Sequence, residues 1–180
     1  RTLSSAARMQ LSSSEIDLYS GDQKTLSASA TRSEMDASGI VWESSDTSVA
    51  AVNGSGVVTA KNPGTATITC YGKNARGIRA ACKVTVKLRQ TTGVKLVSSA
   101  FNRIRISLEV VPGCNRYNIY RWDESGNSKK MATVTADVVT WQDTAVKTGS
   151  TYTYRIRASY VRSGKNTVYG AASPPLAAKA

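Results

Sequence analysis

The side chains that usually perform catalysis are present in this chain with one exception, histidine. Its 180 residues include no histidine, which removes the commonest general base and the commonest metal ligand. Ser44, Ser45 and Asp46 place two hydroxyl groups beside a carboxylate, but a serine nucleophile without histidine needs a lysine or a terminal amine as its base. Because no Ser-x-x-Lys motif stands in a useful context, we interpret these residues as a turn whose side chains bond their own backbone.

Carboxylates offer a second route to chemistry, since a glycoside hydrolase uses two acids that face each other across a cleft. Three pairs of acidic residues stand close together in the sequence: Glu15 with Asp17, Glu34 with Asp36, and Asp123 with Glu124. A calcium ion needs several oxygen ligands, and no acidic cluster here is dense. We therefore predict no catalytic residue, no metal site and no cofactor, and thus no enzyme.

The chain is strongly basic, with a net charge of +12. Residues 1–90 carry 11 basic and seven acidic residues (+4), and residues 91–180 carry 13 and five (+8). A basic surface can attract nucleic acid, anionic polymers or acidic membranes, or it can simply be solvated. The basic residues are scattered singly and form no nucleic-acid motif, so we expect no specific nucleic-acid partner. No stretch approaches the ~20 apolar residues of a membrane span, so we expect no transmembrane segment.

The elements that would position these side chains are short β-strands. Between residues 40 and 72, apolar and β-branched runs alternate with clusters of Gly, Pro, Asn and Ser, and no window has a helical period. The runs are Ile40–Trp42, Val49–Val52, Val57–Ala60 and Thr65–Tyr71. This pattern is typical of consecutive antiparallel strands joined by tight turns.

Four motifs follow one another through this stretch: Val-x-Trp-x-Ser-Ser-Asp, Val-Ala-x-Val, Gly-x-Val-x-Ala and Gly-Thr-Ala-x-Ile. Their positions here are Ile40, Trp42, Ser44, Ser45, Asp46, Val49, Ala50, Val52, Gly56, Val58, Ala60, Gly64, Thr65, Ala66 and Ile68. The motifs and the spacing of the turns between them resemble the bacterial immunoglobulin-like domain, group 2. The resemblance continues to Val86 and covers roughly residues 9–88.

A different pattern begins at Val94 and ends in an alternating run from Thr148 to Ala158. In that run Tyr152 matches the tyrosine whose hydroxyl caps a loop in the fibronectin type III domain, which residues 93–180 resemble. The tryptophan typical of the second strand of that family is Leu108 here, and we expect Trp141 to refill the core.

We therefore predict an all-β chain of two tandem immunoglobulin-like antiparallel β-sandwiches. Residues 1–8 are expected to be a linker, residues 9–89 the bacterial Ig-like domain, and residues 90–180 the fibronectin type III-like domain. Two sandwiches of ~90 to 100 residues each fit the chain length. Because the chain begins at Arg1 rather than Met, we expect it to be part of a longer precursor.

The positions of the three cysteines predict one disulfide and one free thiol. Residues 72–79 read as a basic hairpin loop, with Cys70 and Cys82 symmetric about Arg76. If the flanking strands pair about that centre, the two cysteines face each other with Cβ atoms ~4.5–5.5 Å apart, slightly long for an unstrained bridge. Given an extracellular location we predict a Cys70–Cys82 disulfide, the alternative being two buried reduced thiols. Cys114, in a Pro-Gly-Cys-Asn turn, is expected to be a free thiol.

One candidate ligand-binding surface lies in the second half. Alternation that buries Tyr117 and Ile119 turns Tyr120 and Trp122 outward, and on a later strand turns Arg155 and Arg157 outward. The two strands are neighbours in the fibronectin type III topology, so Tyr120, Trp122, Arg155 and Arg157 are expected to share one exposed sheet face. Aromatic residues and arginine are enriched at binding hot spots, and aromatic rings also stack on sugars. The alternative is that the arginine stems simply pack over the rings.

The two resemblances imply a non-catalytic extracellular adhesion or spacer module of a larger bacterial cell-surface or secreted protein. The alternative is a carbohydrate-binding accessory module of a secreted hydrolase whose catalytic domain lies outside this segment. The expected partner is a cell-surface protein or a polysaccharide, and the expected state is a monomer. The expected location is extracellular, either secreted or attached to the cell wall.

Overall fold

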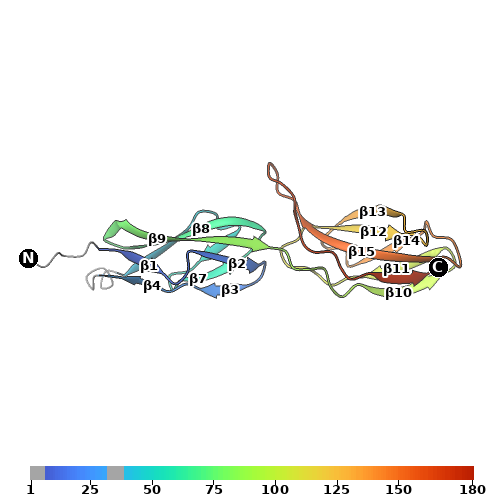
Figure 1. The fold of residues 1–180 in the computed structure, drawn as a ribbon, viewed down its shortest axis with the longest axis horizontal. Helices are drawn as coiled ribbons and strands as arrows, with labels where there is room; N and C mark the ends of the chain where they lie inside the picture. Colours follow the sequence, from blue (N-terminus) through green and yellow to red (C-terminus); the bar gives the residue numbers. More distant parts are fainter. Residues whose placement is uncertain (1–6, 32–38) are drawn as a thin grey trace, which may run out of the picture. The chain divides into compact units, whose positions relative to one another are not determined.

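The computed structural model describes residues 7–31 and 39–180, and its regular structure is all-β, as predicted. The chain divides into two compact units, residues 1–87 and 88–180, each with its own strands (Figure 1). The division falls before Leu88 because this side chain is buried in the core of the second unit. Most of the expected N-terminal linker lies outside the described residues.

The described part of the first unit contains nine strands: β1 (Met9–Leu11), β2 (Glu15–Tyr19), β3 (Gln23–Thr25), β4 (Ala28–Ala30), β5 (Ile40–Ser44), β6 (Ala50–Val52), β7 (Val57–Ala60), β8 (Gly64–Gly72) and β9 (Ala75–Lys87). They form a four-stranded sheet in the order β2-β9-β8-β5, a three-stranded sheet β3-β7-β6, and the pair β1-β4. The pairing of β2 with β9 is parallel, which corrects the expectation of purely antiparallel sheets.

The main core of the first unit lies between its two larger sheets. Its buried residues come from Leu26, from the turn before β6 and from the inward positions of β6, β7, β8 and β9: Leu26, Val49, Ala50, Val58, Ala60, Ala66, Ile68, Cys82, Val84 and Val86. Trp42 packs against this core. Gly56 has a positive φ of 77°, and a Cβ there would lie 2.4 Å from the Leu26 carbonyl oxygen and 2.8 Å from the Trp42 ring. Only glycine fits this turn, which explains one fixed position of the sequence motif.

The β8–β9 hairpin differs from the prediction. Its turn lies at residues 73–74, so β9 begins at Ala75 and the predicted loop 72–79 is mostly strand. An irregularity after Tyr71 moves the register so that Cys70 pairs with Ala80 and Cys82 pairs with Ile68. The directly opposed pairing on which the predicted disulfide depended is therefore wrong, because the cysteines are diagonal neighbours. Both are free, buried thiols, and burial raises the pKa of each.

The second unit contains eight strands: β10 (Lys95–Ala100), β11 (Arg103–Ser107), β12 (Arg116–Trp122), β13 (Ser128–Thr135), β14 (Thr140–Asp143), β15 (Thr151–Tyr160), β16 (Val168–Tyr169) and β17 (Leu176–Lys179). One sheet has the order β10-β11-β14. The other has the order β13-β12-β15-β16, with β17 also paired to β15. All of these pairings are antiparallel.

Alternating residues of the two sheets fill the second core. They are chiefly Ile104 and Ile106 of β11, Tyr117 and Ile119 of β12, and Tyr154, Ile156 and Ala158 of β15. Leu108 is buried here, and Trp141 of β14 packs against the core with its ring edge-on to Tyr154 at 6.3 Å. Trp141 thus takes part in the core, as expected from its position in the sequence.

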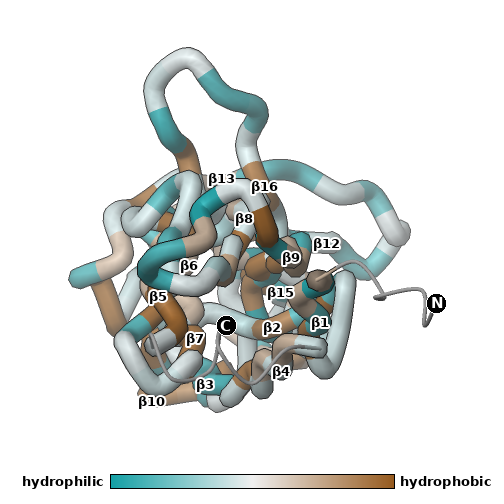
Figure 2. Tube along the Cα trace, turned by 90° about the vertical axis from the view of Figure 1, so that its left-hand side faces the viewer, coloured by the Kyte–Doolittle hydropathy of each residue, from teal (hydrophilic) through white to brown (hydrophobic). Residues whose placement is uncertain are grey.

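The hairpin between β15 and β16, residues 161–167, projects beyond the strands of its unit (Figure 1). Its tip is hydrophilic, whereas hydrophobic residues follow the strands (Figure 2). The loop therefore adds polar surface at the β16 edge of the larger sheet.

Candidate functional site

The outward face of β12 and β15 carries all four of the ligand-binding residues expected from the sequence. Tyr120 is opposite Arg155 in the antiparallel ladder, and Trp122 is opposite Thr153. Arg157 is opposite Asn118, two positions along the same face. Because directly paired residues point to the same side of a sheet, the two aromatic rings and two guanidinium groups share one surface.

The alternation of β12 decides which side chains face outward. Tyr117 and Ile119 are fully buried, so their neighbours Asn118 and Tyr120 point away from the core. Asn118 is nevertheless covered, because its Nδ2 donates to Ser159 Oγ at 2.9 Å and its Oδ1 accepts a hydrogen bond from Thr133. The hydrophobic core thus fixes the direction of the surface residues.

Rings and guanidinium groups contact each other across this face. The Tyr120 and Trp122 rings are 6.4 Å apart and tilted by 45°. Arg155 Cζ lies 6.0 Å from the Trp122 ring centroid, and Arg157 Cζ lies 4.5 Å from that of Tyr169. Arg157 Nε also donates to the Gly170 carbonyl oxygen at 2.8 Å. These cation–π contacts restrict the orientation of both arginines.

Three further residues of this surface escaped the sequence analysis. Lys130 of β13 pairs with Tyr120, and Arg116 begins β12 on the same side. Alternation along β12 and β13 could have placed both. Tyr169 could not have been found in this way, since β16 is only two residues long and has no pattern. We call the resulting surface the basic face: Arg116, Tyr120, Trp122, Lys130, Arg155, Arg157 and Tyr169.

The five strands of this sheet contain no aspartate or glutamate. Within the described residues, none of the four cations of the basic face makes an ion pair. The surface is therefore positive and has no carboxylate of its own sheet to neutralise it. Such a surface attracts anionic groups and speeds their encounter.

Beneath this sheet lies a buried polar network. Arg121 Nη1 donates to Asp143 Oδ2 at 2.8 Å, and the Tyr154 hydroxyl donates to the same oxygen at 2.8 Å. The Asp143 side chain is 1% exposed and that of Arg121 is 16% exposed. Burial and the bond to Asp143 raise the pKa of the Tyr154 hydroxyl above its usual value. Since every charge is paired inside the protein, we interpret the network as structural.

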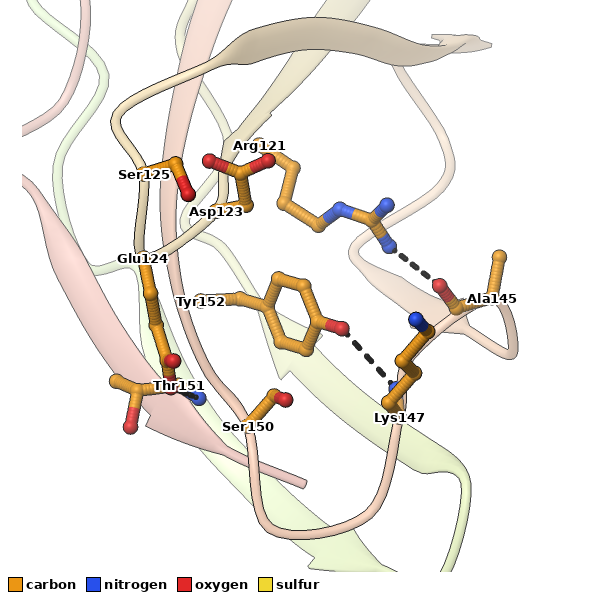
Figure 3. Close-up of a pocket in the computed structure, with 9 residues that line it drawn as sticks. All are labelled: Arg121, Asp123, Glu124, Ser125, Ala145, Lys147, Ser150, Thr151 and Tyr152. Atoms are coloured by element: carbon orange, nitrogen blue, oxygen red, sulfur yellow. Dashed lines mark hydrogen bonds between the residues drawn. The ribbon is translucent and has the colours of Figure 1, made fainter.

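A polar pocket of about 320 Å³ lies between the turn that follows β12 and the loop that joins β14 to β15 (Figure 3). It is lined by Arg121, Asp123, Glu124, Ser125, Ala145, Lys147, Ser150, Thr151 and Tyr152. The Tyr152 hydroxyl accepts a hydrogen bond from Lys147 N at 3.0 Å, which is the tyrosine corner expected from the sequence. Arg121 donates to the Ala145 carbonyl oxygen, and Glu124 accepts from Thr151 N. These side chains hold loops in place.

The Asp123–Glu124 pair does not form two facing acids. Asp123 accepts hydrogen bonds from the backbone and side-chain nitrogens of Asn127, and the backbone bond is the main cause that lowers its pKa. Glu124 bonds the backbone of Thr151 instead. Both carboxylates thus stabilise turns, which differs from the arrangement in glycoside hydrolysis.

The remaining chemical candidates of the first unit also have local partners. Ser44 Oγ donates to the Ala50 carbonyl oxygen, Ser45 Oγ accepts from Thr67 N, and Asp46 accepts from Ser48 N. Glu15 pairs with Lys83 and Asp17 with Lys87, while Glu34 and Asp36 lie outside the described residues. In the part of the chain that the structure describes, no three His, Cys, Asp or Glu side chains gather as a metal site would require.

The strand order, the Trp42 contact with Gly56 and the hydrogen-bonded Ser44–Ser45–Asp46 turn give the first unit the features expected from its motifs. Residues 5–84 match the bacterial Ig-like domain (group 2). The predicted resemblance of this part of the chain is confirmed. Bacterial Ig-like domains of this group occur in extracellular bacterial proteins. Among the described residues, no helix has the length and apolar character needed to cross a membrane.

A curated relative is similar to part of the chain. An uncharacterized protein of Clostridium acetobutylicum is 35% identical over 81 residues, which are 45% of this chain and 8% of that protein. The chain therefore spans less than a tenth of the length of this relative.

Solved fibronectin type III domains are also similar to the chain. One is from human collagen XX, with 16% identity, a TM-score of 0.43, and coverage of 52% of this chain and 92% of that one. Another is a Fn3-like protein from Clostridium thermocellum, with 28% identity, a TM-score of 0.39, and coverage of 48% and 86%.

Proposed function

We propose that this chain is a non-catalytic adhesion and spacer module of a larger bacterial cell-surface or secreted protein, and that it binds its partner through the basic face. The observation that supports this proposal is a surface with four cations and three aromatic rings on a sheet whose strands contain no acidic residue. Aromatic residues and arginine contribute most to binding at interfaces. Each unit has its own packed core, which suits a rigid spacer.

We also propose a location, an oligomeric state and domain limits for the chain. The chain is extracellular and monomeric, with a linker at 1–8 and domains at 9–89 and 90–180, and the buried Leu88 starts the second packed unit two residues before the proposed limit. Sedimentation equilibrium of the purified chain tests the monomer, and a stable dimer would contradict it. Separate expression of the two segments tests the domain limits, since each should give a cooperative unfolding transition alone.

The binding role is tested by binding of the whole chain to a panel of soluble and insoluble polysaccharides and to isolated bacterial cell walls. We expect Trp122→Ala and Arg157→Ala each to weaken whatever binding is found. Arg105→Ala is the matched control, because Arg105 is exposed on β11 of the opposite sheet. If neither substitution on the basic face changes binding, the partner uses another surface. If nothing in the panel binds, only the spacer role remains.

A second candidate function is a carbohydrate-binding accessory module of a secreted hydrolase. The observation that favours it is the group of aromatic rings, Tyr120, Trp122 and Tyr169, since rings stack on sugars. The sequence of the full-length precursor separates the two functions. A catalytic domain on the same chain supports the accessory module, and its absence supports adhesion.

A further inference from the structure

The basic face is organised to receive carboxylates. We propose that it binds an acidic polysaccharide whose sugars carry carboxylate groups, with Arg155 and Arg157 as the recognising residues. This inference rests on the proposed function, since it names the ligand class of the same surface. It depends on how the two arginines are held and on the absence of acidic residues from the sheet.

The contacts of Arg157 leave its outer edge available. Its Cζ lies over the Tyr169 ring, 4.5 Å from the centroid, and its Nε donates a hydrogen bond to the Gly170 carbonyl oxygen. Within the described residues no group of the protein bonds its two Nη atoms. Two parallel N–H donors on a held, planar group match the two oxygens of a carboxylate. Because the side chain is already oriented, binding costs less conformational entropy.

Arg155, two residues before Arg157 on the same strand, also lies over an aromatic ring. It stands over the Trp122 ring at 6.0 Å, is exposed, and has no hydrogen-bond or ionic partner in the described structure. Residues two apart on one strand are about 6.8 Å apart, since a strand rises ~3.4 Å per residue. Lys130 and Arg116 continue the positive surface on β13 and β12. A row of separated cations fits a polymer with repeated charges better than one small anion.

The same contacts argue against nucleic acid as the ligand. Proteins that bind single-stranded nucleic acid offer aromatic faces on which bases stack. On the basic face an arginine already covers one face of the Trp122 ring and one of the Tyr169 ring. In the described structure Tyr120 is the one ring of the basic face without an arginine over it, so the surface presents guanidinium groups and a single ring for stacking.

The test compares two polymers that differ only in charge. The probes are polygalacturonate and its fully methyl-esterified form, which has the same sugar without the carboxylate. We expect the chain to bind polygalacturonate and to bind the ester at least tenfold more weakly. Affinity for polygalacturonate should fall with salt, and the slope of log K against log [salt] should decrease by about 1 when one contacting arginine is removed.

Variants place the site. Arg157→Gln and Arg155→Gln should each weaken binding to polygalacturonate about tenfold, whereas Arg105→Gln on β11 should not. Both substituted arginines are at the surface, and hydrogen exchange of the core peptides confirms that each variant is folded. Equal binding of the polymer and its ester overturns the carboxylate inference but leaves the proposed binding role intact. Tighter binding of a single-stranded oligothymidylate than of polygalacturonate overturns it as well, and so does loss of binding with Arg105→Gln alone.

Discussion

The larger sheets of the two units treat their surface charges in opposite ways. In the first unit three outward cations have partners on their own sheet: Lys83 pairs with Glu15, Lys87 pairs with Asp17, and Arg76 bonds the Tyr71 hydroxyl, which in turn bonds Glu43. In the second unit the cations of the basic face have no carboxylate on their sheet. The first sheet therefore carries carboxylates beside most of its cations, whereas the strands of the second sheet carry none.

The interiors show the reverse distribution. The second unit contains a buried ion pair, Arg121–Asp143, with the Tyr154 hydroxyl bonded to it. The ion pairs described in the first unit are exposed, with side-chain accessibilities above 50%. Exposed pairs contribute little to stability, whereas breaking a buried pair is costly. Removing one partner of the buried pair should therefore cost the second unit more than removing one partner of an exposed pair costs the first.

The largest expected contrast concerns the thiols. Cys70 and Cys82 of the first unit are completely buried, while Cys114 of the second is partly exposed. Alkylation of the folded chain should modify Cys114 at least ~10³-fold faster than the other two, because these become accessible only when the first unit opens. Mass spectrometry of peptides measures the rates. When the chain is unfolded in denaturant without reductant, a thiol reagent should detect three free thiols. Detection of only one free thiol would mean that Cys70 and Cys82 form a disulfide after all.

Removal of the buried carboxylate of Asp143 should destabilise the second unit and leave the stability of the first unchanged. Asp143→Ala leaves Arg121 without its partner and removes the acceptor of Tyr154, so the second unit should lose about 3–5 kcal/mol. The first unit should keep its stability. Hydrogen exchange followed by peptide reports each unit separately. A loss shared equally by both units would show that they do not unfold independently.

A carboxylate added to the basic face should make it resemble the sheet of the first unit. Thr153→Glu places an acid on the same side of β15 as Arg155, two residues away. Binding to polygalacturonate should weaken about tenfold, or ~1.4 kcal/mol. Thr153→Gln is the control of equal size and should bind normally. Identical affinities for the two variants would mean that the charge of this face does not matter.

The tyrosine corner should contribute a smaller free energy of unfolding, and only to the second unit. Tyr152→Phe removes the acceptor of Lys147 N and keeps the ring that packs against Arg121. We expect a loss of ~0.5–1.5 kcal/mol in urea denaturation, the usual contribution of one hydrogen bond. Binding to polygalacturonate should not change, because the basic face lies elsewhere. A loss of affinity would instead assign the loop pocket to the ligand.

The smallest effect is expected at the exposed pairs of the first unit. Asp17→Asn breaks the contact with Lys87 on a solvated surface. Its urea midpoint should be indistinguishable from that of the unaltered chain, since solvent screens such pairs. The hydrogen bond to Asp17 is the main cause that raises the Lys87 pKa, so the substitution should lower that pKa, which NMR titration can follow. A clear loss of stability would show that pairing on this face is structural.

The sequence allowed the strands and the direction of their side chains to be predicted, but it did not determine how the strands are aligned. Val58, Ile68 and Val84 face the first core because their strands alternate, and alternation is a local property. The alignment of Cys70 with Ala80 depends on an irregularity after Tyr71 that no local pattern indicates. For the same reason Tyr120 and Arg155 could be placed on one face, whereas Tyr169, on a two-residue strand, could not.

The parallel ladder between β2 and β9 has a mechanical consequence for the first unit. Its five residue pairs join β2, which comes early in the sequence of the unit, to the last residues of β9, Lys83–Lys87, where the unit ends in the sequence. Tension applied to the two ends of this unit would drag the strands past each other lengthwise, so these pairs would carry the load together. When an antiparallel pair is pulled apart at its open end, its inter-strand hydrogen bonds are loaded and broken one after another. The first unit is therefore arranged to resist stretching by shear.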